Sequence, residues 1–287
     1  MYLPVVVGVD GSESSLGAVD WATGEADLHG VALRIVYASL WERYEGAAFA
    51  REFGGPAAQV TAEDVLAAAV RRARRARGGL PVTTAVVREE PEYVLLRESR
   101  NASLLVVGSR GRGGFAGLVL GSVGLTVATR ADCPVVVIRD DHDDAAVTGR
   151  HGRIVVGVAD TPTAAVRFAC AEARRRDAVL EAVRAWRGPA RETAGHPPLT
   201  GGPERLYEER AAKELDAALA GAPGDVTLRR RVVEGPARRV LLDVGADADL
   251  LAVGRRRSRH LGPHLGRVAH TVLHHRGCPV VIVPDDD

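Results

Sequence analysis

The sequence repeats itself once along its length, and this repeat limits the possible folds more than any other feature. Three pairs of segments match in order: 5–9 (VVVGV) with 154–158 (IVVGV), 104–108 (LLVVG) with 250–254 (LLAVG), and 133–138 (CPVVVI) with 278–283 (CPVVIV). Equivalent residues are separated by 145 to 149 positions. A nearly constant spacing kept along the chain indicates a tandem duplication of one domain.

The duplication predicts two domains joined by a short segment. We expect the first domain at residues 1–140 and the second at residues 152–287. Residues 141–151 contain Asp141, Asp143 and Asp144 and show no apolar period, which is typical of a solvent-exposed acidic linker. The length of 287 residues agrees with two domains of ordinary size.

Within each repeat, short apolar runs alternate with stretches rich in Ala, Arg and Glu. In the first repeat we expect strands near 4–9, 32–38, 82–88, 103–108 and 134–139, and helices near 13–28, 61–78, 91–101 and 121–131. In the second repeat we expect strands near 153–158, 179–186, 226–233, 249–254 and 279–283. Continuously apolar strands that alternate with helices are typical of parallel sheets covered on both faces. The expected fold class is α/β, with two tandem doubly wound parallel five-stranded sheets of Rossmann-like type.

Charge and hydropathy argue against several kinds of partner. The chain has 38 Lys and Arg against 37 Asp and Glu, a net charge of +1, whereas nucleic-acid binders are usually far more basic. Its longest apolar runs are too short to span a bilayer. The start lacks the basic region of a signal peptide, and the odd count of three Cys does not form a disulfide framework. We therefore expect a cytoplasmic protein that binds neither nucleic acid nor membrane.

A glycine-rich loop follows the fourth expected strand of the first repeat. Gly108, Gly111, Gly121 and Ser122 have the spacing G-x2-G-x9-G-S. Glycine allows a tight turn and close backbone approach to a ligand, and the helix that begins at 121 presents unpaired N–H groups to an anion. Arg110 lies in this loop, and its guanidinium group suits phosphate oxygens. The residues predict a polyphosphate-binding loop, and the alternative is a Gly-rich connection with an ordinary helix cap.

The strand order and this glycine spacing resemble the universal stress protein family in its tandem two-domain form. The resemblance covers nearly the whole chain, twice over, and in that family the pattern G-x2-G-x9-G-[ST] marks the ATP-binding branch. It implies ATP, carried with Mg²⁺, in the first repeat. The implied contacts are Gly108, Gly111, Gly121 and Ser122 with the ribose and phosphates, the Val123 amide beside them, Asp10 with the adenosine moiety, and the backbone from Val36 to Ala38 with the adenine edge.

The second repeat departs from this pattern. Arg257 stands in place of Gly111 and Arg267 in place of Ser122. Ala159 stands in place of Asp10, so the carboxylate is either missing or moved one position along, to Asp160. A long side chain at position 257 would obstruct the backbone approach, so we expect that the second repeat does not bind ATP in the same way. The Arg-rich segment either binds another anion or is a solvated loop.

These observations lead to one expected function and two alternatives. We expect a nucleotide-dependent regulatory or stress-response protein that binds ATP and is at most a slow ATPase, with no catalytic or metal-ligating residue identified. The alternatives are an interaction scaffold that binds no nucleotide and an ATP-cleaving, adenylating enzyme, whose loop the segment 10–15 (DGSESS) echoes loosely. A dinucleotide oxidoreductase is excluded because neither first strand is followed by G-x-G-x-x-G.

The fifth strand of each repeat bears on assembly. Both are apolar candidate edge strands, which proteins usually pair or cover. By resemblance to the family, in which this strand pairs across a two-fold axis, we expect the two repeats to form an intramolecular pseudo-dimer. Two chains can then associate further into a homodimer.

Overall fold

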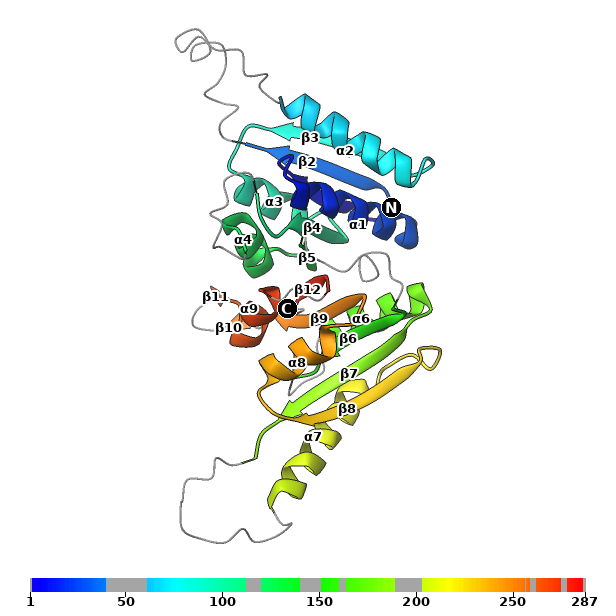
Figure 1. The fold of residues 1–287 in the computed structure, drawn as a ribbon, viewed down its shortest axis with the longest axis vertical. Coiled ribbons are helices and arrows are strands. Elements are labelled where there is room, and N and C mark those ends of the chain that lie inside the picture. The colour runs from blue at the N-terminus through cyan, green and yellow to red at the C-terminus, as the bar shows by residue number, and fades with distance from the viewer. Residues whose placement is uncertain are drawn as a thin grey trace. The chain divides into compact units, whose positions relative to one another are not determined.

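The computed structural model describes residues 2–39, 61–111, 120–139, 151–159, 164–188, 203–255, 257–258, 262–274 and 278–285 (Figure 1). The chain divides into two compact units, Met1–His142 together with Ser258–His264, and Asp143–Arg257 together with Leu265–Asp287. The expected linker, apart from His151, lies outside the described residues.

The first unit contains a parallel sheet with the strand order β3-β2-β1-β4-β5. Its strands are β1 (Val5–Val9), β2 (Leu33–Ala38), β3 (Val82–Val87), β4 (Leu104–Gly108) and β5 (Val135–Ile138). In the register, Gly8 of β1 lies opposite Val36 of β2. The chain winds outward from β1 to β3, then returns to β4 on the other side of β1. The expected α/β class with a doubly wound parallel sheet is therefore confirmed.

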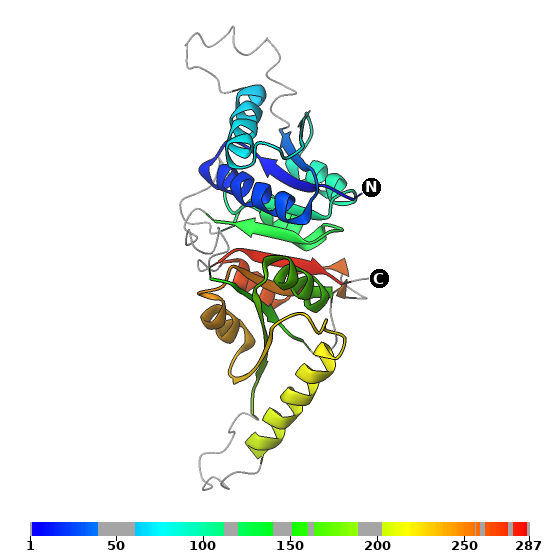
Figure 2. The ribbon, with the colours of Figure 1, turned by 90° about the vertical axis from the view of Figure 1, so that its right-hand side faces the viewer.

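Helices cover both faces of this sheet (Figures 1 and 2). They are α1 (Glu13–His29), α2 (Ala62–Ala76), α3 (Pro91–Ser99) and α4 (Ser122–Arg130). Helix α1 packs against α2 on one face, and α3 packs against α4 on the other. Because β1 and β4 lie beneath helices on both faces, their valine and leucine side chains are buried, as the continuous apolar pattern predicted.

The second unit has the same topology, with the strand order β8-β7-β6-β9-β12. Its strands are β6 (Arg153–Gly157), β7 (Val179–Trp186), β8 (Leu228–Glu234), β9 (Leu250–Arg255) and β12 (Val280–Pro284), and its helices are α6 (Ala164–Arg176), α7 (Pro203–Leu219), α8 (Ala237–Gly245) and α9 (Arg267–Leu273). Two short strands, β10 (Arg257–Ser258) and β11 (Gly262–Pro263), follow β9 in the chain, and β11 belongs to the first unit. The duplicated sequence thus produces a duplicated fold.

The cysteines are part of the packed interior. Cys133, Cys170 and Cys278 are buried free thiols. Burial raises the pKa of Cys170 and raises the pKa of Cys278 to about 12. A thiol that stays protonated at neutral pH is a poor nucleophile, so Cys170 and Cys278 act as small apolar residues. No helix within the described ranges is long and apolar enough to cross a membrane.

The winding of the first unit places a switch point between β1 and β4. Helix connections leave these neighbouring strands toward opposite sides of the sheet, so a crevice opens beyond their carboxyl ends. The residues that follow Val9 and Val107 border this crevice. Doubly wound sheets bind ligands at this place, so a ligand site is expected there in each unit.

Two glycines of the first helix region test how local backbone geometry stabilises this unit. Gly30 ends α1 at φ +65°, in the left-handed region, and its N–H donates to the Ala26 and Asp27 carbonyls. Gly24 lies inside the helix, and a Cβ atom added there would have nothing within 4 Å. We expect Gly30→Ala to lower the free energy of unfolding by roughly 1 kcal/mol and Gly24→Ala to raise it by roughly 0.5–1 kcal/mol. Urea unfolding of the full chain measures both changes in the free energy of unfolding. If the two changes have the same sign, the role assigned to Gly30 at the end of α1 is wrong.

Candidate functional site

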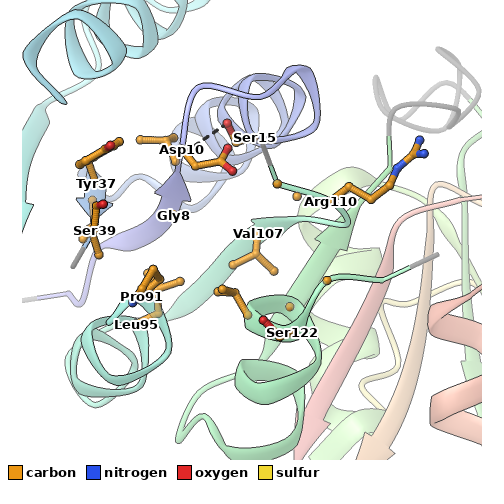
Figure 3. Close-up of a pocket in the computed structure, with 18 of the residues that line it drawn as sticks. Gly8, Asp10, Ser15, Tyr37, Ser39, Pro91, Leu95, Val107, Arg110 and Ser122 are labelled. Carbon is orange, nitrogen blue, oxygen red and sulfur yellow. Dashed lines mark hydrogen bonds between the residues drawn. The ribbon is translucent and has the colours of Figure 1, made fainter. Parts of the chain in front are cut away.

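A cavity of about 600 Å³ opens at the carboxyl ends of β1, β2 and β4 in the first unit (Figure 3). We call it the first cavity. All nine residues that the sequence singled out line it: Asp10, Val36, Ala38, Gly108, Arg110, Gly111, Gly121, Ser122 and Val123. The strands that carry them are far apart in sequence, and the parallel sheet brings their ends together at one edge.

The turn between β1 and α1 holds Asp10 in a fixed orientation. Ser12 donates to Asp10 Oδ1 twice, from its N–H at 3.0 Å and from its hydroxyl at 2.6 Å. The Ser15 hydroxyl accepts from the N–H groups of Asp10 at 3.4 Å and Gly11 at 3.2 Å (Figure 3). Gly11 has φ +83°, which a side chain would strain. The carboxylate is therefore preorganised at the end of β1.

Serine side chains also tie this turn to the glycine-rich loop. The Ser12 hydroxyl donates to the Arg110 carbonyl at 3.3 Å, and the Arg110 N–H donates to Ser14 Oγ at 3.4 Å. Ser14 in turn donates to the Ile138 carbonyl at 3.4 Å. The two loops on either side of the switch point are thus held as one rigid edge of the first cavity.

Gly108 and Gly111 are required for different reasons. A Cβ atom on Gly108 would lie 2.7 Å from Ser14 Oγ and 2.8 Å from the Ser14 carbonyl carbon. We expected Gly108 to allow close approach of a ligand to the backbone, and the structure shows that it also allows close approach of the start of α1. A Cβ atom on Gly111 would lie 2.6 Å from Asp10 Oδ2, so this glycine leaves room for the carboxylate.

The amino end of α4 faces the first cavity. Gly121 is the N-cap residue, and no side chain in the described residues caps the helix there. Ser122 is the first helical residue, and its hydroxyl donates to Glu92 Oε1 at 3.1 Å, so Ser122 does not cap α4. The first N–H groups of a helix have no partner within it, and they favour an anion.

The opposite wall is mostly apolar. Tyr37, which lies in the segment expected at the adenine edge, lines it together with Ser39, Pro91 and Leu95, which sequence reasoning missed; Figure 3 shows these residues grouped away from Arg110. Leu95 packs against β1, where a Cβ atom on Gly8 would lie 3.0 Å from Leu95 Cδ1. The run of serines after Asp10 was the signal for the hydrogen-bonded turn, whereas nothing local in the sequence marks α3 as a wall.

Arg110 lines the cavity at its edge. In Figure 3 its guanidinium group extends away from Asp10 and Ser122. A contact between this side chain and a ligand at the amino end of α4 requires another rotamer. The backbone of Arg110, which is bonded to Ser12 and Ser14, is the part that shapes the edge.

The second unit has a cavity of about 430 Å³ at the equivalent place, which we call the second cavity. Gly157, Gly254, Gly266 and Leu241 line it and correspond to Gly8, Gly108, Gly121 and Leu95 of the first unit. Ala159 takes the place of Asp10, and Arg267 that of Ser122. Arg257 lies in β10, and its side chain is outside the described residues. The backbone frame is retained while the polar groups differ.

A pair of substitutions separates the two roles assigned to glycine. Gly108→Ala forces a Cβ atom against backbone atoms of Ser14, so we expect a loss of roughly 1–3 kcal/mol in the free energy of unfolding. Gly111→Ala meets only the Asp10 carboxylate, a side-chain group that can turn, so its loss should be smaller. Chemical denaturation of both variants measures the difference. Equal losses in the free energy of unfolding would show that the contact with Ser14 is not the reason why position 108 requires glycine.

Comparison with known proteins agrees with the duplicated fold. The model of the universal stress protein family matches residues 1–139 and again residues 151–284. Universal stress protein Rv2005c of Mycobacterium tuberculosis is 33% identical over 303 aligned positions, covering 97% of this chain and 96% of that protein. Universal stress protein Rv1996 of the same organism is 31% identical, covering 99% of this chain and 96% of its own length.

A solved structure shows the same architecture. A universal stress protein from Archaeoglobus fulgidus superposes with a TM-score of 0.66 at 18% identity, covering 98% of both chains. At this identity the likeness concerns the fold alone. Together with the family match over both halves, these findings show that the chain belongs to the universal stress protein family.

Proposed function

We propose that the first unit binds ATP and that the protein acts as a nucleotide-dependent regulator with little or no hydrolysis. The observation that carries this proposal is the convergence of Asp10, the loop 108–111 and the amino end of α4 on one cavity. A volume of about 600 Å³ lies within the range of small-molecule sites. The proposal also rests on the sequence resemblance to the ATP-binding branch of the family.

The polar groups of the first cavity match the parts of a nucleotide. Phosphate oxygens would accept hydrogen bonds from the amide N–H groups of Ser122, Val123 and Gly124, because the dipole of α4 places partial positive charge there. The Asp10 carboxylate, oriented by Ser12, would accept a hydrogen bond from a hydroxyl of the nucleoside. The apolar wall that includes Leu95 and the backbone of Val36 to Ala38 would hold the base.

The same residues favour binding over chemistry. Among the described residues that line the first cavity, Asp10 is the only carboxylate, and no His or Cys is present. Asp10 accepts two hydrogen bonds from Ser12, which suits a fixed acceptor better than a mobile general base. One carboxylate cannot form a protein cage for Mg²⁺, so we propose that Mg²⁺ arrives with the triphosphate.

Assembly and location complete the proposal. The buried thiols are compatible with a reducing compartment, and we propose the cytoplasm. Pairing of the two repeats within a chain and association of two chains also remain part of this proposal. If sedimentation finds only monomers at high concentration, the proposed association of two chains is wrong.

The nucleotide content of the purified chain tests the proposal directly. We expect about one ATP per chain after denaturation and ion-exchange chromatography, and its loss in Gly121→Val. A Cβ atom on Gly121 would be 3.7 Å from the Ser109 carbonyl, an ordinary contact, so the variant should fold. Gly266→Val is the matched control, because it changes the equivalent cap residue of the second cavity.

Other results of this measurement favour the alternatives. No retained nucleotide and no ATP binding by calorimetry would support a scaffold that binds no nucleotide. Steady release of pyrophosphate with an added substrate would support an adenylating enzyme. Two ATP per chain, one of them lost in Gly266→Val, would show that the second cavity also takes the nucleotide.

Asp10→Asn tests the contact assigned to the nucleoside. Asparagine keeps an oxygen for the Ser12 bonds but removes the negative charge, and hydrogen bonds to charged groups contribute about 1.5–3 kcal/mol. We therefore expect ATP affinity to fall by roughly tenfold or more. Inorganic triphosphate, which has no nucleoside, should bind both proteins equally well in calorimetry. An equal loss for both ligands would contradict the assignment of Asp10 to the nucleoside.

A further inference from the structure

A carboxylate stands at the amino end of α4, where the proposed nucleotide would place its phosphates. Ser122, the first residue of α4, lines the first cavity, and its hydroxyl donates to Glu92 Oε1 at 3.1 Å. Glu92 lies in the first turn of α3, and the two residues meet because α3 packs against α4. Through Ser122, Glu92 therefore reaches the edge of the first cavity.

The charge of Glu92 is not balanced by an ion pair with any cation in the described part of the chain. Ser122 is its one hydrogen-bond partner there, whereas the neighbouring Glu89 pairs with Arg97 at 3.0 Å. The guanidinium group of Arg110, at the edge of the cavity, extends away from Ser122 (Figure 3). The negative charge of Glu92 therefore acts on whatever binds at the amino end of α4.

A phosphate group and Glu92 would compete for the same part of α4. A phosphate oxygen that accepts from the N–H group or the hydroxyl of Ser122 would lie next to the carboxylate that accepts from that hydroxyl. Two unit negative charges about 4 Å apart repel each other enough to weaken binding roughly fivefold in bulk water, and much more at the lower effective dielectric constant of a protein surface. The repulsion grows with the charge of the phosphate chain.

We propose that Glu92 selects the charge state of the nucleotide: it disfavours a metal-free triphosphate, so that a triphosphate carrying Mg²⁺ is the form that binds. Bound Mg²⁺ cancels two negative charges of the triphosphate, and less repulsion from Glu92 then remains. Adenosine has no phosphate and does not meet this repulsion. The inference rests on the proposed ATP function and makes Glu92 a residue that determines specificity at the same site.

Calorimetry on the full chain tests the inference with three ligands, which are adenosine, ATP in the presence of EDTA, and ATP with excess Mg²⁺. Glu92→Gln removes the charge and keeps an oxygen that can accept from Ser122. We expect this variant to bind metal-free ATP about tenfold or more tightly than the wild type does, and ATP with Mg²⁺ at most about threefold more tightly. Its affinity for adenosine should not change.

Glu90→Gln is the matched control. It removes the same charge two positions earlier, from an exposed side chain that makes no capping hydrogen bond at the start of α3, so it should leave all three affinities near the wild type. An equal gain in both variants, an equal gain for adenosine, or no gain for metal-free ATP would overturn the role of Glu92. If neither the wild type nor Glu92→Gln binds ATP in either form, the proposed ATP function is wrong, and this inference is wrong with it.

Discussion

Gly108 lies so close to α1 that a Cβ atom on it would stand 2.7 Å from Ser14 Oγ and 2.8 Å from the Ser14 carbonyl carbon. This close approach joins the end of β4 to the start of α1, on the two sides of the switch point. Within the same turn the Ser12 and Ser15 side chains hold Asp10, and the loop at Gly111 passes beside its carboxylate. The geometry of the first cavity depends on this one backbone contact, which only glycine permits.

The two units show which features of such a site belong to the backbone and which to side chains. Glycines at the ends of the first and fourth strands and at the helix cap occur in both units, and both cavities remain open. The charges that face the cavities are set by single side chains, such as Asp10 and Ala159 at the ends of β1 and β6. One fold can therefore offer two cavities of different chemistry without a change in its frame.

Sequence reasoning predicted the fold well, because the strands of these sheets are buried on both faces and read as unbroken apolar runs. It also predicted nine residues that line the first cavity, since glycine spacing and strand ends are local features. It did not predict that Gly108 serves α1, that Ser122 donates to Glu92, or that Leu95 forms a wall. These contacts join segments far apart in the chain, and a residue's neighbours in sequence do not reveal them.

The composition of the first cavity bears on what the protein could do with the nucleotide that we propose it binds. The amino end of α4 presents main-chain N–H groups to it, and Asp10, the one carboxylate among the described lining residues, accepts two hydrogen bonds from Ser12. Rigid amides and a fixed acceptor stabilise the ground state of a ligand, whereas hydrolysis needs a group that moves a proton to or from water. If this cavity binds ATP as we propose, such a site would hold the nucleotide without a group placed to move a proton, and occupancy itself would be the signal.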